Sequence, residues 1–325
     1  MTDRSTISSR WRTRALIGVP AVVLTWAAFR PPDSNSRDAN KFTVVATTGQ
    51  VGDLARQVGG EHVNVTTLMG PGVDPHLFKA SESNVIDLVE ADLILYSGIH
   101  LEGNLAEVLE QAQKQIPTTA VTAGIPEAEL IMPLDDAFYG NPDPHFWFDP
   151  ALWAMATDHV AEAFAEEDPA NAESYRANAE RYKAEVMALD AWAAERFADV
   201  PEERRILVTA HDAFGYLGRR YGLQVAGLQG ISTSSEAGVR DVQNIADLIA
   251  ANEVNAIFVE SSVPRRTIEA VQVAVADRGW NVVIGDELFS DALGDADTPE
   301  GTWLGMMRYN IDAIVSGLTG EDLTA

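Results

Sequence analysis

The sequence predicts an α/β protein with two lobes, each built on a mostly parallel β-sheet flanked by helices, and joined by one long rigid helix. Two observations lead to this fold class. Short β-branched runs alternate with amphipathic stretches in both halves of the chain, as they do in βαβ units. Between the halves, residues 169–200 contain no glycine and repeat apolar side chains every three to five positions, which predicts one helix of about 45 Å.

The first lobe is expected to alternate strands with helices. The strand-like runs are β-branched or continuously apolar, and they lie at 42–48, 62–68 and 93–96. The helical runs lie at 51–58 and 81–90. In the second helical run Ser81 is suited to cap the N-terminus, and Val85, Leu88 and Val89 fall on one face.

The second lobe begins near Ile206 and repeats the alternation. Its strand-like runs lie at 206–210, 224–228, 256–260 and 281–284. We therefore expect an N-terminal lobe at 41–165, a connecting helix at 166–201 and a C-terminal lobe at 202–325. In open parallel sheets, ligands bind beyond the carboxyl ends of the strands, so candidate site residues are sought there.

Residues 1–40 are expected to direct export. Arginines at 4, 10, 12 and 14 precede an apolar stretch at 15–29, which is shorter than the roughly 20 residues of a membrane span and suits a signal peptide. Because no clear small-residue cleavage site follows, an N-terminal anchor followed by a spacer is the alternative. The predicted location is extracytoplasmic, in the periplasm or on the outer face of the cytoplasmic membrane.

The composition excludes several functions. The 325 residues carry a net charge of −26, whereas nucleic-acid binding needs basic patches. Without cysteine, the chain can form neither a disulfide nor a lipid-modified cysteine. It also lacks a Gly-x-x-x-x-Gly-Lys-Ser/Thr segment for binding nucleotide phosphates. Contact with a membrane is expected only through the N-terminal segment or a membrane partner, and the protein is expected to be a monomer.

Three of the six histidines are candidate metal ligands. His76 and His145 each end an Asp-Pro-His tripeptide, and His211 ends a predicted strand. Imidazole is the commonest protein ligand of divalent transition metals. In each tripeptide the proline restricts the backbone before the histidine, and the aspartate could accept the second ring N–H.

The remaining histidines have other expected roles. His62 is expected to face solvent from a strand, and His159 to be structural within a helix. His100 follows a strand and is ambiguous. A site of three histidines also needs a carboxylate for charge and as a fourth donor, and position alone does not choose among Glu260, Asp286 and Asp291.

Four longer segments contain the candidate ligands. They are Gly72-Val73-Asp74-Pro75-His76, Asp143-Pro144-His145-Phe146-Trp147-Phe148-Asp149-Pro150, His211-Asp212-Ala213-Phe214-Gly215-Tyr216 and Phe289-Ser290-Asp291. In this order they resemble the ligand loops of the manganese, zinc and iron solute-binding proteins of metal ABC transporters, the TroA-like family. The resemblance runs through nearly the whole chain after the N-terminal segment, and the family's fold is two α/β lobes joined by one long helix.

The resemblance implies an extracytoplasmic receptor rather than an enzyme. It would capture one divalent transition metal ion between the lobes and deliver it to the permease of an ABC transporter. It also favours Asp291 over Asp286 as the fourth donor. The implied ligands, two from each lobe, are His76, His145, His211 and Asp291.

Manganese is the favoured ion and zinc is a close second. The segments 98–103, 229–238 and 260–264 resemble the manganese-or-zinc branch, and the stretch 125–141 lacks the histidines typical of the zinc-specialised branch. Three imidazoles and one carboxylate nevertheless suit zinc. The alternative functions are a secreted zinc metallohydrolase, with Glu260 as its base, and a metal-dependent adhesin.

Overall fold

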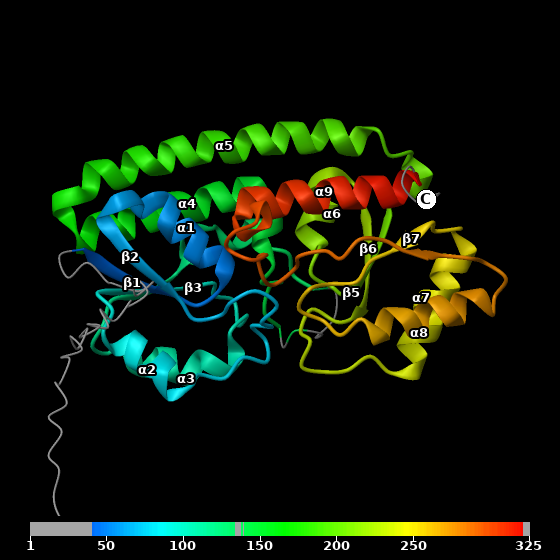
Figure 1. The fold of residues 1–325 in the computed structure, drawn as a ribbon, viewed down its shortest axis with the longest axis horizontal. Coiled ribbons are helices and arrows are strands. Elements are labelled where there is room, and N and C mark those ends of the chain that lie inside the picture. Colours follow the sequence, from blue (N-terminus) through cyan, green and yellow to red (C-terminus); the bar gives the residue numbers. More distant parts are fainter. Residues whose placement is uncertain (1–40, 134–137, 139, 321–325) are drawn as a thin grey trace, which may run out of the picture. The chain divides into compact units, whose positions relative to one another are not determined.

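The computed structural model describes residues 41–133, 138 and 140–320. The predicted signal peptide or anchor at 1–40 lies outside these residues. Among the described helices, none combines the length and the apolar character that a membrane crossing requires. The described chain is an α/β fold with parallel sheets, two lobes and a long helix, which confirms the predicted fold class (Figure 1).

The N-terminal sheet has four parallel strands in the order β2-β1-β3-β4. They are β1 (Phe42–Ala46), β2 (Val63–Thr67), β3 (Leu93–Tyr96) and β4 (Thr118–Ala120). Side chains alternate between the two faces of the sheet. Val44 and Ala46 therefore join the main core on one face, while Val45 and Ile94 pack under the helices on the other.

Helices cover both faces of this sheet. One face is covered by α1 (Gly49–Gly59) and α4 (Pro150–Glu167), the other by α2 (Glu82–Val89) and α3 (Ala106–Ala112) (Figure 1). Ser81 caps α2 as predicted, since its hydroxyl accepts from the N–H of Asn84. Val85, Leu88 and Val89 share one face of this short helix as predicted, but the helix contacts the core through Leu88, whereas Val85 and Val89 are 40% and 61% exposed.

The strands of the C-terminal lobe form two parallel pairs, placed in the same order as the four strands of the N-terminal sheet. The pairs are β5 (Ile206–His211) with β6 (Gln224–Gln229), and β7 (Ala256–Ile257) with β8 (Val283–Ile284). The N–H of Phe258 donates to the carbonyl of Val208, which connects the two pairs. The last two strands are shorter than predicted, and beyond them a single bridge joins Glu260 to Leu288. The helices of this lobe are α6 (Gly215–Tyr221), α7 (Val239–Ala251) and α8 (Arg266–Ala276).

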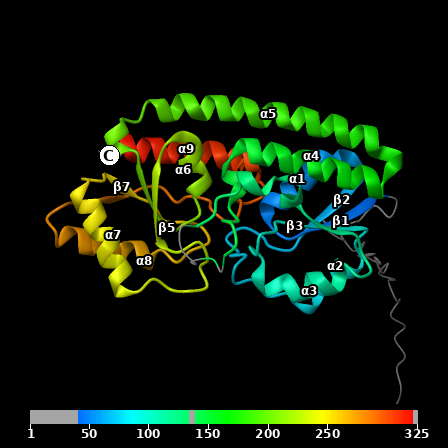
Figure 2. The same ribbon diagram turned by 180° about the vertical axis from the view of Figure 1, so that it is seen from behind.

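The predicted long helix is α5 (Ala172–Ala198), whose 27 residues span about 40 Å. It passes over both sheets, with α4 beneath its first half and α9 (Trp303–Thr319) beneath its second (Figures 1 and 2). Its buried side chains include Tyr175, Tyr182, Val186 and Phe197, at the predicted spacing. Trp303 stacks on Trp153 of α4, with ring centroids 5.4 Å apart, so α9 ties the last segment of the chain to the first lobe.

The loop after β3 is held by a buried carboxylate. Glu102 accepts from the hydroxyl of Thr47 at 2.6 Å and from the N–H groups of Ser97 at 2.7 Å and Gly98 at 3.3 Å. The next two residues, Ile99 and His100, have φ angles of 51° and 58°, which residues with a Cβ rarely adopt. The Glu102 contacts therefore fix a backbone that would otherwise relax.

The buried Glu102 predicts a pH-dependent stability. Burial raises the pKa of this carboxyl, so the folded protein holds its proton more tightly than the unfolded chain. Its contribution to stability is largest below the ordinary pKa and falls as pH rises through the raised pKa. In urea unfolding of the metal-free protein, the stability of wild type relative to Glu102→Gln should fall between pH 4 and pH 7.

Glu110→Gln is the control, because Glu110 is an exposed glutamate of the neighbouring α3. A difference between wild type and Glu102→Gln that stays constant over this pH range would contradict the account.

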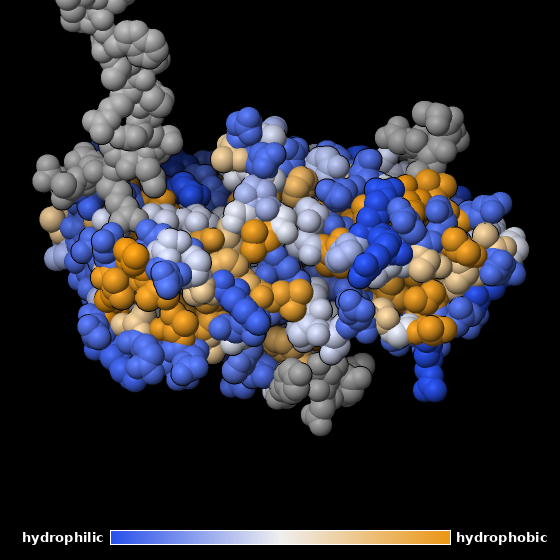
Figure 3. Space-filling view, turned by 60° about the horizontal axis from the view of Figure 1, so that its bottom comes forward, coloured by the Kyte–Doolittle hydropathy of each residue, from blue (hydrophilic) through white to orange (hydrophobic). Residues whose placement is uncertain are grey.

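The face of the molecule that includes α2 and α8 exposes several apolar side chains. The exposed side chains include Ile86 and Val89 of α2 and Val273 of α8. Figure 3 turns this face forward and shows apolar side chains in several patches among hydrophilic ones.

Candidate metal centre

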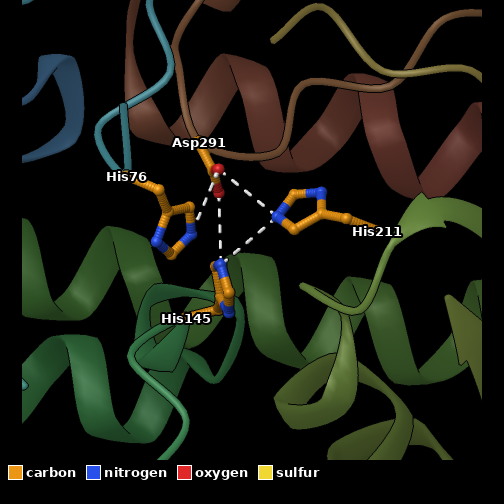
Figure 4. Close-up of side chains that lie close together, drawn as sticks. All are labelled: His76, His145, His211 and Asp291. Atoms are coloured by element: carbon orange, nitrogen blue, oxygen red, sulfur yellow. Dashed lines mark hydrogen bonds and ion pairs between the residues drawn. The ribbon is translucent and has the colours of Figure 1, made fainter. Parts of the chain in front are cut away.

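The four residues implied by the resemblance lie together in the structure (Figure 4). His76 lies in the loop after β2, and His145 directly precedes a short 3-10 helix at Phe146–Phe148. His211 is the last residue of β5, and Asp291 follows β8. Their nearest donor atoms all lie within 4.8 Å of one another. Parallel strands thus deliver residues distant in sequence to one place, as expected for the carboxyl ends of such sheets.

The separations between donor atoms suit a metal ion. His145 Nε2 and His211 Nε2 each lie 3.3 Å from an oxygen of Asp291 and 3.4 Å from one another. His76 Nε2 lies 3.7 Å from Asp291 Oδ2. A tetrahedral ion with donors at about 2.0–2.1 Å places neighbouring donors about 3.3–3.4 Å apart. The cluster therefore has the size of a first coordination shell.

The cluster is buried and its hydrogen bonds are incomplete. His145 and His211 are 0% exposed, Asp291 2% and His76 6%. Among the described residues, both oxygens of Asp291 and Nε2 of His76 lack a hydrogen-bond partner. Buried polar atoms without partners are costly, so their convergence on one point makes this a site that could hold a cation.

Two of the imidazoles are held by carboxylates. Asp143 Oδ1 accepts from both the backbone N–H of His145 at 2.9 Å and its ring Nδ1 at 2.7 Å. Glu260 accepts from the backbone N–H of His211 at 2.8 Å and from ring Nδ1 at 2.5 Å. Both contacts fix the ring with Nε2 toward Asp291 and make it a stronger donor to a metal.

The charges within the cluster oppose the effect of burial. Burial would lower the pKa of His145, but the carboxylates of Asp143 and Asp291 raise it to about 9. The pKa of His211 is raised well above its usual range because Glu260 and Asp291 outweigh burial. The pKa of His76 falls to about 3, chiefly through burial. Without a metal ion, the imidazoles of His145 and His211 therefore favour the protonated, positively charged form beside Asp291.

The first Asp-Pro-His tripeptide differs from the second. Asp143 accepts a ring N–H of His145, as the sequence predicted. Asp74 instead accepts the backbone N–H of His76 at 2.8 Å and the hydroxyl of Thr233 at 2.5 Å. The predicted contact of Asp74 with an imidazole is therefore wrong, because its second oxygen is used by a residue of the other lobe.

The loop of Asp291 is held from several sides. The carbonyl of Ser290 accepts from Gln50 Nε2 and from Trp147 Nε1, both at 3.2 Å. Asn310 of α9 bonds both the N–H and the carbonyl of Phe289. No signal in the sequence pointed to Gln50, whereas Trp147 lies in the segment that resembles a ligand loop, two residues after His145.

The other candidates lie outside the cluster of donors. Glu260 supports His211 through Nδ1, and Asp286 is exposed. His62 ends a 3-10 turn rather than lying on a strand, and its ring meets Tyr175 edge-on. His159 bonds Thr119, consistent with a structural role, and His100 is exposed.

The chain is similar to known metal-binding proteins over most of its length. Residues 44–317 match the ZnuA family, zinc-uptake complex component A, periplasmic. The manganese-binding lipoprotein MntA of Bacillus subtilis is 45% identical over 287 residues, which cover 88% of this chain and 93% of that protein. The zinc-binding protein TroA of Treponema pallidum is 44% identical over 286 residues, covering 87% of this chain and 92% of that protein.

A solved structure shares the fold. The structure of the periplasmic zinc-binding protein TroA from Treponema pallidum matches with a TM-score of 0.83 and 43% identity. The match covers 86% of this chain and 99% of that one. The two-lobed arrangement predicted from the sequence is therefore also that of a solved metal-binding protein.

The contact between Glu260 and His211 predicts a loss of metal affinity in Glu260→Gln. An amide cannot accept both N–H groups as a carboxylate does, so His211 becomes a weaker and less well oriented donor. Loss of such a supporting group typically costs 10–100-fold in affinity. Competition with a chromogenic chelator measures the change for zinc.

Glu269→Gln is the matched control, because Glu269 is an exposed glutamate of the same lobe. Equal affinities of Glu260→Gln and wild type would show that the contact does not support a ligand.

Proposed function

Because the chain belongs to the ZnuA family of periplasmic metal-uptake components, we propose that it captures one divalent transition metal ion outside the cytoplasm and delivers it to an ABC transporter. The observation that carries this proposal is the buried cluster of His76, His145, His211 and Asp291. The ion is cargo, so the protein contributes binding and release. Its partner is the membrane permease of the transporter, and we propose that it acts as a monomer.

Manganese is the proposed cargo, with zinc a close second. Each oxygen of Asp291 lies 3.3 Å from an imidazole Nε2, so the carboxylate can supply one or two donors. Four donors suit tetrahedral zinc, whereas a fifth approaches the higher coordination number and oxygen content that manganese favours. Since zinc has the greater intrinsic affinity for such donors, availability outside the cell would decide which ion is carried.

The rival functions lack support. A catalytic zinc site keeps a coordination position open for water and a base beside it. Here the obvious base, Glu260, is 2% exposed and already bonds His211 at both oxygens. The relatives described above are metal-binding proteins by name, and none of those names is that of a hydrolase or an adhesin.

The proposed cargo site predicts reversible binding of one ion per chain. Wild type should bind one equivalent of manganese or zinc, and zinc should displace manganese. Removal of the ion by a chelator should leave the far-ultraviolet circular dichroism unchanged, because the fold is held by an apolar core that contains none of the four proposed ligands. A structural metal site would instead unfold with its ion.

His211→Ala tests the ligand assignment. Loss of this donor should weaken binding by more than the about 100-fold that loss of a supporting carboxylate can cost. His62→Ala is the control, because His62 lies outside the cluster. Isothermal titration with zinc measures both variants, and wild-type affinity in His211→Ala would refute the assignment.

A further inference from the structure

Three of the four proposed ligands are tied together across the two lobes. Trp147, two residues after His145, donates to the carbonyl of Ser290 beside Asp291. Tyr216, in the helix that follows His211, donates to the carbonyl of Asp143 at 2.8 Å and accepts from the N–H of Ile131 at 3.1 Å. His145, His211 and Asp291 thus belong to one hydrogen-bonded unit that includes both lobes.

His76 is attached differently. No carboxylate in the described part of the chain accepts a hydrogen bond from its ring Nδ1, in contrast to the rings of His145 and His211. Its backbone carbonyl accepts from Asn104 at 3.0 Å and its N–H donates to Asp74, both within the N-terminal lobe. Among the described residues, the contact of Asp74 with Thr233 is the one hydrogen bond that joins the loop of His76 to the C-terminal lobe.

A cavity also reaches His76. It has a volume of about 390 Å³, and its lining includes His76, His100, Asn104, Phe138, Ser232 and Ser234. Both lobes contribute to this lining, since Ser232 and Ser234 flank Thr233. His76 is also the most exposed of the four proposed ligands, at 6%. A shift of its loop toward this cavity would open the buried cluster to solvent.

We propose that His76 is the ligand through which the ion enters and leaves, and that Thr233 is the positioning residue that holds His76 in place through Asp74. This inference rests on the proposed function. Breaking the hydrogen bond between Thr233 and Asp74 frees the His76 loop, while the other three donors keep their contacts. The ion then loses one donor and leaves through the cavity. There the imidazole of His100, the amide of Asn104 and the hydroxyl of Ser232 can replace the lost ligand.

The rate of zinc release tests this inference. Zinc-loaded protein is mixed in a stopped-flow instrument with excess chromogenic chelator, and the release rate is read from the colour. Thr233→Ala should release zinc about 10-fold faster, the effect of losing a hydrogen bond to a charged group. Thr233→Ser keeps the hydroxyl and should release zinc at nearly the wild-type rate. Thr267→Ala is the control, because the Thr267 hydroxyl bonds Pro264 within the same lobe.

A second measurement separates positioning from general loosening. In the nuclear magnetic resonance spectrum of the zinc-loaded Thr233→Ala protein, the ring signals of His76 should broaden by exchange, while those of His145 and His211 stay sharp. Equal broadening of all three would overturn the special role of His76. Thermal unfolding of the metal-free variants confirms that the fold is intact.

The outcomes also distinguish this inference from the proposed function. If wild type binds no zinc, the proposed function fails. If wild type binds one zinc but Thr233→Ala and wild type release it at the same rate, the proposed function stands and the role of Thr233 is refuted. Faster release from Thr233→Ser as well as Thr233→Ala would equally refute a role for the hydroxyl.

Discussion

The buried carboxylate of Asp291 is the constraint on which the site depends. A carboxylate without hydrogen-bond partners is costly in the protein interior, and removal of a charge that neutralises it is strongly destabilising. Around Asp291 the described residues place three imidazole Nε2 atoms at 3.3–3.7 Å, rather than hydrogen bonds of ordinary length. The cost of this arrangement is offset when a cation joins the four groups, so the ion would stabilise the local arrangement of the donors while the apolar core holds the fold.

The fold meets this constraint by supporting each donor from a different direction. Two rings are oriented by the buried carboxylates of Asp143 and Glu260, and the Asp291 loop is held by Trp147 from the first lobe. The stiff helix α5 passes over both sheets, so the lobes are joined by a regular element rather than a flexible linker (Figure 1). Such a frame favours local movement of one ligand loop over wide separation of the lobes.

Local sequence signals were sufficient for the fold and for three of the four residues that cluster in the structure. The spacing in α5 and the β-branched runs predicted the elements, and the paired Asp-Pro-His tripeptides with the strand-terminal His211 selected the imidazoles. Spacing could not choose Asp291, because the tertiary fold alone decides which acidic residue reaches the imidazoles. It also missed Thr233, whose partner is 159 positions away, since long-range pairs leave no local pattern. The exposed Val89 of α2 shows likewise that a shared helical face need not be buried.

The position of the bound ion tests the central claim most directly. Crystals of the zinc-loaded protein, measured at the zinc absorption edge, would locate the ion by its anomalous scattering. The account predicts one peak within about 2.0–2.2 Å of a carboxylate oxygen of Asp291 and of Nε2 of His76, His145 and His211. A peak at other residues, or one with Glu260 in place of Asp291, would contradict it.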